Sequence, residues 1–337
     1  MRLVVTGVAG FIGMHTALRL LQMGHEVTGV DNLNDYYDPQ LKHDRLAQLT
    51  GQPGFHFERR DITDTAGFNC LLADVRPQRI VHLAAQAGVR HSIDHPMEYV
   101  SANLVGFMNV LEACRQHEVE HLVYASSSSV YGNNSAIPFS EHHAVDHPLS
   151  IYAASKRANE LMAHVYSHLH GLPTTGLRFF TVYGPWGRPD MAPVLFARAI
   201  AADQPIAVFN YGKHQRDFTY IDDIVTGVVA VACGPLPQGQ MPVEKPDDPA
   251  ASTGPWRIYN IGNNQPVQLM DFLAELQSCL GKPARLEMQP SQPGDVLDTW
   301  ADCSDLQRDF AYHPDTSLAA GMQQFVNWFR GYYDGNE

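Results

Sequence analysis

Short hydrophobic runs alternate with longer amphipathic stretches along the first half of the 337-residue chain. The runs are typical of β-strands and cover 3–5, 26–30, 55–57, 79–83, 121–125 and 174–179. Apolar residues recur at helical spacing in the segments 14–23, 100–117 and 152–170. Repeated strand–helix units predict a doubly wound α/β fold, in which helices cover both faces of a parallel sheet.

The pattern changes after about Gly184, where the elements shorten and proline and glycine become more frequent. Residues 218–232 predict a strand followed by a helix, and 317–332 predict an amphipathic C-terminal helix. The proline-rich segment 234–255 predicts a solvated loop. We therefore expect a first domain over 1–183 and a smaller mixed α/β region over 184–337, with the chain crossing back to the first domain.

Charge and cysteine content narrow the class of partner. Asp and Glu number 36 against 23 Lys and Arg, a formal charge of −13, which argues against nucleic acid and anionic membranes as partners. No apolar run approaches the roughly 18 residues of a membrane span. The five cysteines are scattered, with no CxxC pair, so we expect free thiols and a cytoplasmic location.

Histidines are numerous, 17 in all, and raise the question of a metal site. His164 and His168 have helical i, i+4 spacing, and His142, His143 and His147 gather in a loop. Neither group has an acidic or cysteine third ligand at a persuasive spacing. The sequence therefore predicts no metal site.

A glycine-rich turn separates the first strand from the first helix. Gly7, Gly10 and Gly13 form a G-x-x-G-x-x-G pattern, which lets the backbone approach a pyrophosphate at the helix N-terminus. Asp31 follows the second strand, where a carboxylate accepts from a ribose 2′-hydroxyl and repels a 2′-phosphate, so NAD is favoured over NADP. Asp61 ends the third strand and either accepts from the adenine amino group or caps the following helix.

A tyrosine, a lysine and a serine run provide candidate acid–base chemistry. Tyr152 and Lys156 have i, i+4 spacing and share one helical face. A neighbouring ammonium, together with the positive charge of nicotinamide, would lower the pKa of the phenol from about 10 and let it take a proton from an alcohol. The run Ser126–Ser129 ends the fifth strand, at the sheet edge where ligands bind in open α/β folds.

These motifs together resemble the extended short-chain dehydrogenase/reductases of the nucleotide-sugar epimerase/dehydratase group, over nearly the whole chain. The resemblance implies a Rossmann-type NAD domain, a C-terminal region that binds a UDP-sugar, and oxidation of a sugar hydroxyl followed by return of the hydride to the other face. It implies that Tyr152 is the acid/base and that Lys156 orients the ribose and lowers the pKa of Tyr152. Ser127 or Ser129 would hold the 4-hydroxyl of the sugar. The NAD contacts that it implies, beyond those already given, are Phe11, Ile12, Asn32, Ile62, Leu83, Ala84, Ala85, Ser126, Asn103 under the nicotinamide pocket, and Phe180 packed against it.

Three segments resemble the UDP-glucuronate 4-epimerase branch more narrowly: 31–38, 85–92 and 181–191. Arg90 and Arg188 lie in loops expected at the carboxyl edge of the sheet, and Arg188 is a candidate for a bidentate grip on the sugar carboxylate. The resemblance implies that the hydroxyl of Thr181 contacts the sugar or its carboxylate, and that Arg216 pairs with the UDP phosphates. Residues 292–295 stand where neutral-sugar epimerases tend to carry an arginine, which leaves a second phosphate contact unassigned.

The preferred hypothesis is a UDP-glucuronate 4-epimerase that works through a 4-keto intermediate and tightly bound NAD. Members of the group that decarboxylate or dehydrate place an acid just after the active hydroxyl, and Ser128–Val130 contain none. The alternatives are a 4-epimerase of a neutral UDP-hexose or UDP-N-acetylhexosamine, a UDP-glucuronate decarboxylase, and a non-catalytic NAD-binding sensor. The family resemblance also implies a homodimer through a four-helix interface made by 99–117 and 152–170.

Overall fold

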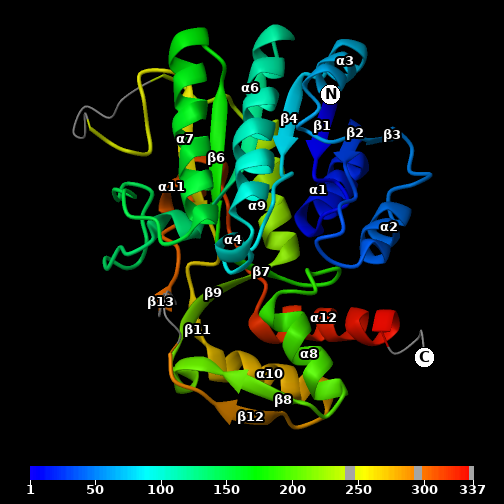
Figure 1. Ribbon diagram of the computed structural model, residues 1–337, viewed down its shortest axis with the longest axis vertical. Coiled ribbons are helices and arrows are strands. Elements are labelled where there is room, and N and C mark those ends of the chain that lie inside the picture. The colour runs from blue at the N-terminus through cyan, green and yellow to red at the C-terminus, as the bar shows by residue number, and fades with distance from the viewer. Residues whose placement is uncertain (240–246, 292–297, 334–337) are drawn as a thin grey trace.

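The computed structural model, which describes residues 1–239, 247–291 and 298–333, is built around a seven-stranded parallel sheet (Figure 1). Its strand order is β10-β6-β5-β4-β1-β2-β3. The strands are β1 (Arg2–Thr6), β2 (Glu26–Asp31), β3 (Phe55–Arg59), β4 (Arg79–His82), β5 (His121–Ser127), β6 (Thr174–Phe179) and β10 (Trp256–Ile261). The order reverses direction at β1 and β4, which creates a switch point between these two strands.

Helices cover both faces of this sheet because consecutive strand residues point to opposite sides. Leu3 and Val5 are buried with α1 (Phe11–Gln22) and α9 (Ile221–Cys233) on one face. Val4 is buried on the other face with α3 (Thr65–Val75), α6 (Phe107–Gln116) and α7 (Ile151–His170). The predicted doubly wound α/β fold is confirmed.

The helix α7 carries the candidate catalytic pair, and its ends follow from the sequence. Ser150 is the N-cap, and its hydroxyl accepts from the backbone N–H of Ala153 at 3.1 Å. Gly171 ends the helix in the left-handed region, with φ of +66°. Tyr152 therefore lies in the first turn, close to the carboxyl edge of the sheet.

The predicted helix over 100–117 differs in the structure. It is preceded by the short helices α4 (His91–Asp94) and α5 (Pro96–Tyr99), and its first part is a π-helix, η1 (Val100–Gly106), that continues into α6. Asn159 of α7 donates to the carbonyl of Asn103 at 2.6 Å. A donor inserted at a helix carbonyl is a recognised cause of such departures from α geometry.

A smaller region lies below the main sheet in Figure 1. Its strands are β7 (Thr181–Tyr183), β9 (Gln215–Tyr220), β11 (Pro266–Gln268) and β13 (Asp298–Thr299), with a separate pair of β8 (Pro205–Val208) and β12 (Arg285–Met288). Its helices are α8 (Ala192–Ala201), α10 (Leu269–Leu280) and α12 (Leu318–Tyr333). The chain returns to the main sheet twice, as α9 and as β10, where α11 (Ser304–Phe310) packs on β10.

The remaining elements are the helix α2 (Pro39–Ala47) and the 3-10 turns η2 (Ser128–Tyr131) and η3 (Phe209–Gly212). Within the described ranges, no helix is both long and apolar enough to cross a membrane. The strand β10 was not predicted, and it directly follows the segment 234–255 that was expected to be a solvated loop.

Candidate active site

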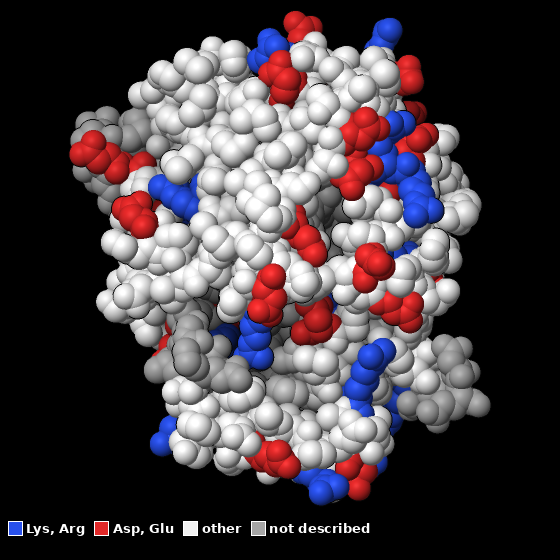
Figure 2. All heavy atoms as spheres, in the orientation of Figure 1, with Lys and Arg blue, Asp and Glu red and all other residues white. Residues whose placement is uncertain are grey.

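A cavity of about 1010 Å³ opens at the carboxyl ends of the central strands, between the larger and the smaller region. The face shown in Figure 2 is hollowed at this level, and Lys and Arg side chains are scattered there among Asp and Glu. The cavity brings together every predicted site residue except Asn103. These are Gly7, Gly10, Phe11, Ile12, Gly13, Asp31, Asn32, Asp61, Ile62, Leu83, Ala84, Ala85, Arg90, Ser126, Ser127, Ser129, Tyr152, Lys156, Phe180, Thr181, Arg188 and Arg216.

The glycine turn between β1 and α1 fits a dinucleotide. A Cβ atom on Gly13 would lie 2.0 Å from the carbonyl oxygen of Gly7, and one on Gly10 would lie 2.9 Å from the same atom. Gly7 has a φ of +72°, and a Cβ there would lie 2.7 Å from the backbone nitrogen of Ala84. The turn is thus closed to side chains, and the N-terminus of α1 faces a lining built from backbone, which suits a pyrophosphate.

Asp31 ends β2 at the wall of the cavity. One oxygen accepts from the Ala9 N–H at 3.0 Å and the other from the Leu33 N–H at 2.9 Å. Burial raises the pKa of this carboxyl, while the two backbone donors and Lys42 oppose the shift. Each carboxylate oxygen retains a lone pair, so the residue can hold its turn and still accept from a ribose hydroxyl.

Asp61 is not a helix cap, which corrects one of the two predicted roles. The cap of α3 is Asp64, which accepts from Gly67. One oxygen of Asp61 accepts from the backbone and the hydroxyl of Thr63, and the other from Asn32 at 2.8 Å. Asp61 therefore joins the ends of β2 and β3 at the wall of the cavity.

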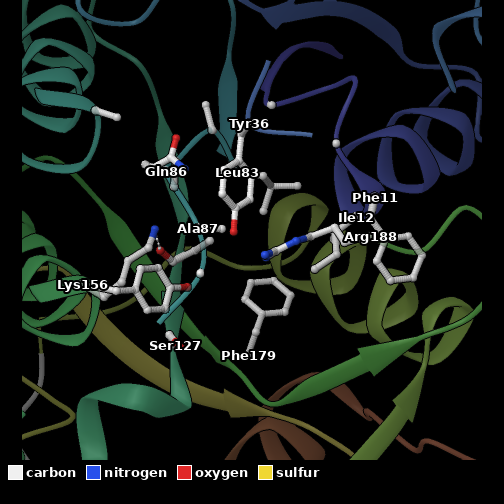
Figure 3. Close-up of a pocket in the computed structure, with 18 of the residues that line it drawn as sticks. Phe11, Ile12, Tyr36, Leu83, Gln86, Ala87, Ser127, Lys156, Phe179 and Arg188 are labelled. Atoms are coloured by element: carbon white, nitrogen blue, oxygen red, sulfur yellow. Dashed lines mark hydrogen bonds between the residues drawn. The ribbon is translucent and has the colours of Figure 1, made fainter. Parts of the chain in front are cut away.

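Tyr152, Ser127 and Lys156 meet on one side of the cavity. Figure 3 shows Lys156 and Ser127 together there, with Arg188 entering from the opposite side beneath Tyr36. Ser127 is the last residue of β5, and its hydroxyl donates to Ser129 at 3.2 Å. Lys156 is buried, and its ammonium donates to the carbonyl of Ala125 at 2.8 Å.

The pKa of Tyr152 follows from its burial and its neighbours. Burial raises the pKa of the phenol above its usual value, opposed by its hydrogen bond with Ser127 and by the charge of Arg188. Lys156 is also buried, which lowers the pKa of its ammonium to about 8, and the ammonium donates to the Ala125 carbonyl. The lowering of the phenol pKa by Lys156 together with the nicotinamide charge stays a prediction.

Asn103 lies behind the wall of the cavity and does not line it, so its predicted place under the nicotinamide pocket stays a prediction. Its side chain accepts from the N–H of Gln86 at 2.8 Å and donates to the carbonyl of Gln86 at 3.0 Å. It also donates to the hydroxyl of Ser155 at 3.0 Å. Gln86 lines the cavity, so Asn103 fixes the wall rather than forming it.

Sequence reasoning missed a buried ion pair beneath the serine run. Arg178 of β6 and Glu160 of α7 form two hydrogen bonds, at 2.8 and 2.9 Å, and both side chains are fully buried. Ser126 donates to Glu160 at 2.6 Å, so its hydroxyl is directed away from the cavity that its backbone lines. A carboxylate and an arginine 18 residues apart give no local signal, because only the packing of α7 on the sheet joins them.

Arg188 already has a carboxylate partner in this structure. Asp190 accepts from it through both oxygens, at 3.0 and 2.5 Å, and also accepts from the Tyr36 hydroxyl at 3.0 Å. Although burial opposes it, the charge of Arg188 holds the pKa of Asp190 below its usual value. A substrate carboxylate would therefore have to share or exchange this arginine with Asp190.

The other predicted arginines also line the cavity. The guanidinium of Arg90 lies 5.6 Å from the ring centre of Phe209, and Arg216 donates to the carbonyl of Gln215 at 3.0 Å. The predicted departure at 292–295 lies outside the described residues. Two of the histidines considered above as metal ligands have partners in the protein. His142 pairs with Asp248 and Asp305, and His164 shares a hydrogen bond of 2.8 Å with the hydroxyl of Ser252.

Comparisons with known proteins agree with this geometry. Residues 3–237 match the model of the family described as NAD dependent epimerase/dehydratase. The chain is 50% identical over 333 residues to Protein CapI of Staphylococcus aureus, covering 99% of both chains. It is 44% identical over 330 residues to a probable UDP-glucuronate 4-epimerase of Rhizobium meliloti, covering 98% of this chain and 97% of the relative.

Among solved structures, the chain resembles the UDP-glucuronic acid 4-epimerase of Bacillus cereus in complex with UDP-glucuronic acid and NAD. The TM-score is 0.85 at 33% sequence identity, covering 99% of this chain and 100% of that structure. With the glycine turn, Asp31 and the Tyr152–Lys156 pair gathered in one cavity, the predicted class of enzyme and its cofactor NAD are confirmed, and the chain belongs to the NAD dependent epimerase/dehydratase family.

Proposed function

We propose that the protein is a UDP-glucuronate 4-epimerase, which interconverts UDP-glucuronate and UDP-galacturonate. The observation that carries this proposal is the placement of Arg188 across a single cavity from Ser127 and Lys156, with Tyr152 lining the same cavity and sensing the charge of Arg188. Names of relatives that are 44% identical along nearly the whole chain support the same substrate. Thr181, at the start of β7, adds a hydroxyl to the same wall.

Each residue has a defined part in this reaction. The glycine turn and Asp31 would hold NAD, which would supply the hydride acceptor and donor needed at C4 of the sugar. Tyr152 takes the proton of the 4-hydroxyl as the alcohol becomes a ketone, and gives a proton back when the alcohol re-forms. Ser127 holds the reacting oxygen beside the phenol, and Lys156, one helical turn after Tyr152, orients the ribose and favours the phenolate form of the tyrosine.

Arg188 would hold the sugar carboxylate and select the acidic substrate. A charge-assisted bidentate contact contributes about 1.5–3 kcal/mol, or roughly 10- to 150-fold in kcat/KM. We expect a loss of this size for UDP-glucuronate in the double variant Arg188→Ala/Asp190→Ala. Removing both residues ensures that the loss reports the missing arginine rather than a stranded Asp190 carboxylate.

The matched control for this experiment is Arg285→Ala, since Arg285 is exposed on β12 and donates to the Asp203 carbonyl. The control should turn over UDP-glucuronate like the unaltered protein. Equal kcat/KM in the double variant and the control would contradict the role of Arg188.

One observation favours a neutral UDP-hexose as the alternative substrate. Because Asp190 already neutralises Arg188, the pair as it stands offers no net charge to an acidic sugar. Turnover of UDP-glucose that equals or exceeds turnover of UDP-glucuronate would favour this alternative. The same comparison of kcat/KM for the two sugars therefore decides between them.

The protein is further proposed to be a cytoplasmic homodimer. All five cysteines are free, which fits a reducing compartment. Large apolar side chains are exposed on the neighbouring η1–α6 and α7 helices, and a second copy of the chain would cover them. They are Val105, Met108, Leu161, Val165 and Leu169.

Light scattering coupled to gel filtration tests the dimer. The double variant Leu161→Glu/Val165→Glu should elute as a monomer, because it places charge in the proposed contact. Leu195→Glu is the matched control, since Leu195 lies on α8 and is 49% exposed, close to the 52% of Leu161. A dimeric double variant would rule out this interface.

A further inference from the structure

Two histidines and a glutamate gather at the rim of the cavity, outside the residues assigned to NAD or to the sugar. His91 lies in α4, Glu98 lies in α5, and His95 joins the two short helices. His91 and Glu98 also line the cavity. Figure 1 shows α4 near the lower ends of α6 and α7, at the level where the two regions meet.

The three side chains converge on one point. His91 Nε2 lies 2.9 Å from one oxygen of Glu98, and His95 Nδ1 lies 3.6 Å from the other. One ligand atom from each residue lies within 4.8 Å of the other two. The two imidazole rings stack with their centres 4.3 Å apart and an angle of 19° between their planes.

These separations are close to those of a metal centre. Zinc–ligand bonds of 2.0–2.1 Å in tetrahedral geometry place ligand atoms about 3.3 Å apart. Small side-chain rotations would therefore bring the three groups to coordinating distance. Among residues 1–239, 247–291 and 298–333, this is the one group of three or more His, Cys, Asp or Glu side chains that meets the distance condition.

An ordinary surface ion pair accounts for the cluster less well. A single imidazole would satisfy the glutamate, and exposed ion pairs of that kind contribute little to stability. Here two imidazoles face the two oxygens of the same carboxylate. The non-helical backbone at His95, between α4 and α5, brings the three side chains together.

We propose that His91, His95 and Glu98 bind one divalent transition-metal ion of the zinc class at the rim of the cavity. Two imidazoles and one carboxylate suit zinc, cobalt or nickel better than magnesium or calcium, which prefer oxygen ligands throughout. Three protein ligands leave a coordination position for water. The ion would tie α4 to α5, and its binding is independent of which sugar the enzyme uses.

Titration calorimetry of the tag-free holoenzyme with zinc chloride, in a buffer that does not chelate metals, tests this site. The informative variants are His95→Asn and Glu98→Gln. Both side chains are about half exposed, at 54% and 50%, so the fold should tolerate the changes. Thermal unfolding without zinc verifies that each variant retains the stability of the unaltered protein.

The matched control is His168→Asn. His168 forms the other stacked i, i+4 histidine pair, with His164 on α7, and that pair belongs to no three-ligand group among the described residues. We expect one zinc per chain, with affinity weakened at least about tenfold in His95→Asn and Glu98→Gln and unchanged in the control. No zinc binding to the unaltered protein, or equal affinity in all the variants, would overturn the proposal.

Discussion

The buried ion pair between Glu160 and Arg178 joins the helix that carries Tyr152 to the strand beside the serine run. Both side chains are fully buried, and Glu160 also accepts from Ser126 at 2.6 Å and from Arg157 at 3.0 Å. Although burial opposes it, Arg178 and Ser126 hold the pKa of Glu160 below its usual value. Replacing Glu160 by glutamine keeps the shape and removes the charge.

Glu160→Gln leaves a guanidinium uncompensated in the interior, next to the Tyr131 hydroxyl at 3.1 Å. Removing one partner of such a pair costs about 3–5 kcal/mol, because the remaining charge stays desolvated. The matched control is Glu112→Gln, which breaks the exposed Arg115–Glu112 pair on α6. An exposed pair of this kind contributes only about 0–1 kcal/mol.

Urea unfolding followed by circular dichroism, at one fixed NAD concentration for every variant, measures this difference, because bound NAD itself stabilises the folded chain. The free energy of unfolding should fall several-fold more in Glu160→Gln than in Glu112→Gln. The double replacement Glu160→Leu/Arg178→Met should recover most of the loss, since it removes both charges. Equal effects of the two single variants would refute the reasoning.

Three further predictions concern the cofactor, the pH dependence and the acid–base step. Gly13→Ala should purify with little NAD, because its Cβ would lie 2.0 Å from the Gly7 carbonyl oxygen and distort the glycine turn. Absorbance after acid release measures the NAD, and one NAD per chain would contradict the role of the glycine turn. Hydrogen bonding to Asp305 raises the pKa of His142 to about 9, so this pair stabilises the fold fully below the unfolded value of about 6.5. That stabilisation should disappear as the pH rises from about 6.5 to 9, and His142→Gln should lose this part of the pH dependence in urea unfolding. Tyr152→Phe should lower kcat by about 10²- to 10⁴-fold with KM little changed, and turnover at the normal rate would exclude Tyr152 as the acid/base.

The parts of the site that were predictable depend on short motifs. Gly7, Gly13 and Asp31 lie within one strand–helix–strand unit, and Tyr152 and Lys156 lie within one helical turn. In each case, local spacing fixes the geometry. The parallel sheet with helices on both faces was equally predictable, because repeated strand–helix units favour it.

The parts that were missed depend on packing between distant segments. The Asn159 contact with the Asn103 carbonyl, which accompanies the π-helix, joins positions 56 residues apart. The partner of Lys156 is a backbone carbonyl, which no side-chain pattern reveals. Asp190 follows Arg188 closely enough to be seen in the sequence, but only the structure shows that both of its oxygens face the guanidinium.

The cluster at the cavity rim was within reach of the sequence. His91, His95 and Glu98 carry the spacing of one helical face, whereas the histidine groups at 142–147 and 164–168 lack a third ligand at a suitable spacing. Pro96, directly after His95, argues against a single continuous helix there. The structure instead uses two short helices that keep the three side chains together.

Proton NMR of the purified protein with UDP-glucuronate, and with no cofactor added, tests the central claim most directly. The account predicts that the H4 signal of the sugar changes to the small couplings of UDP-galacturonate, which would show both epimerisation and retained NAD. A UDP-pentose product would mean that the carboxylate is lost and that the protein is a decarboxylase. An unchanged spectrum from protein that contains NAD would contradict UDP-glucuronate as the substrate.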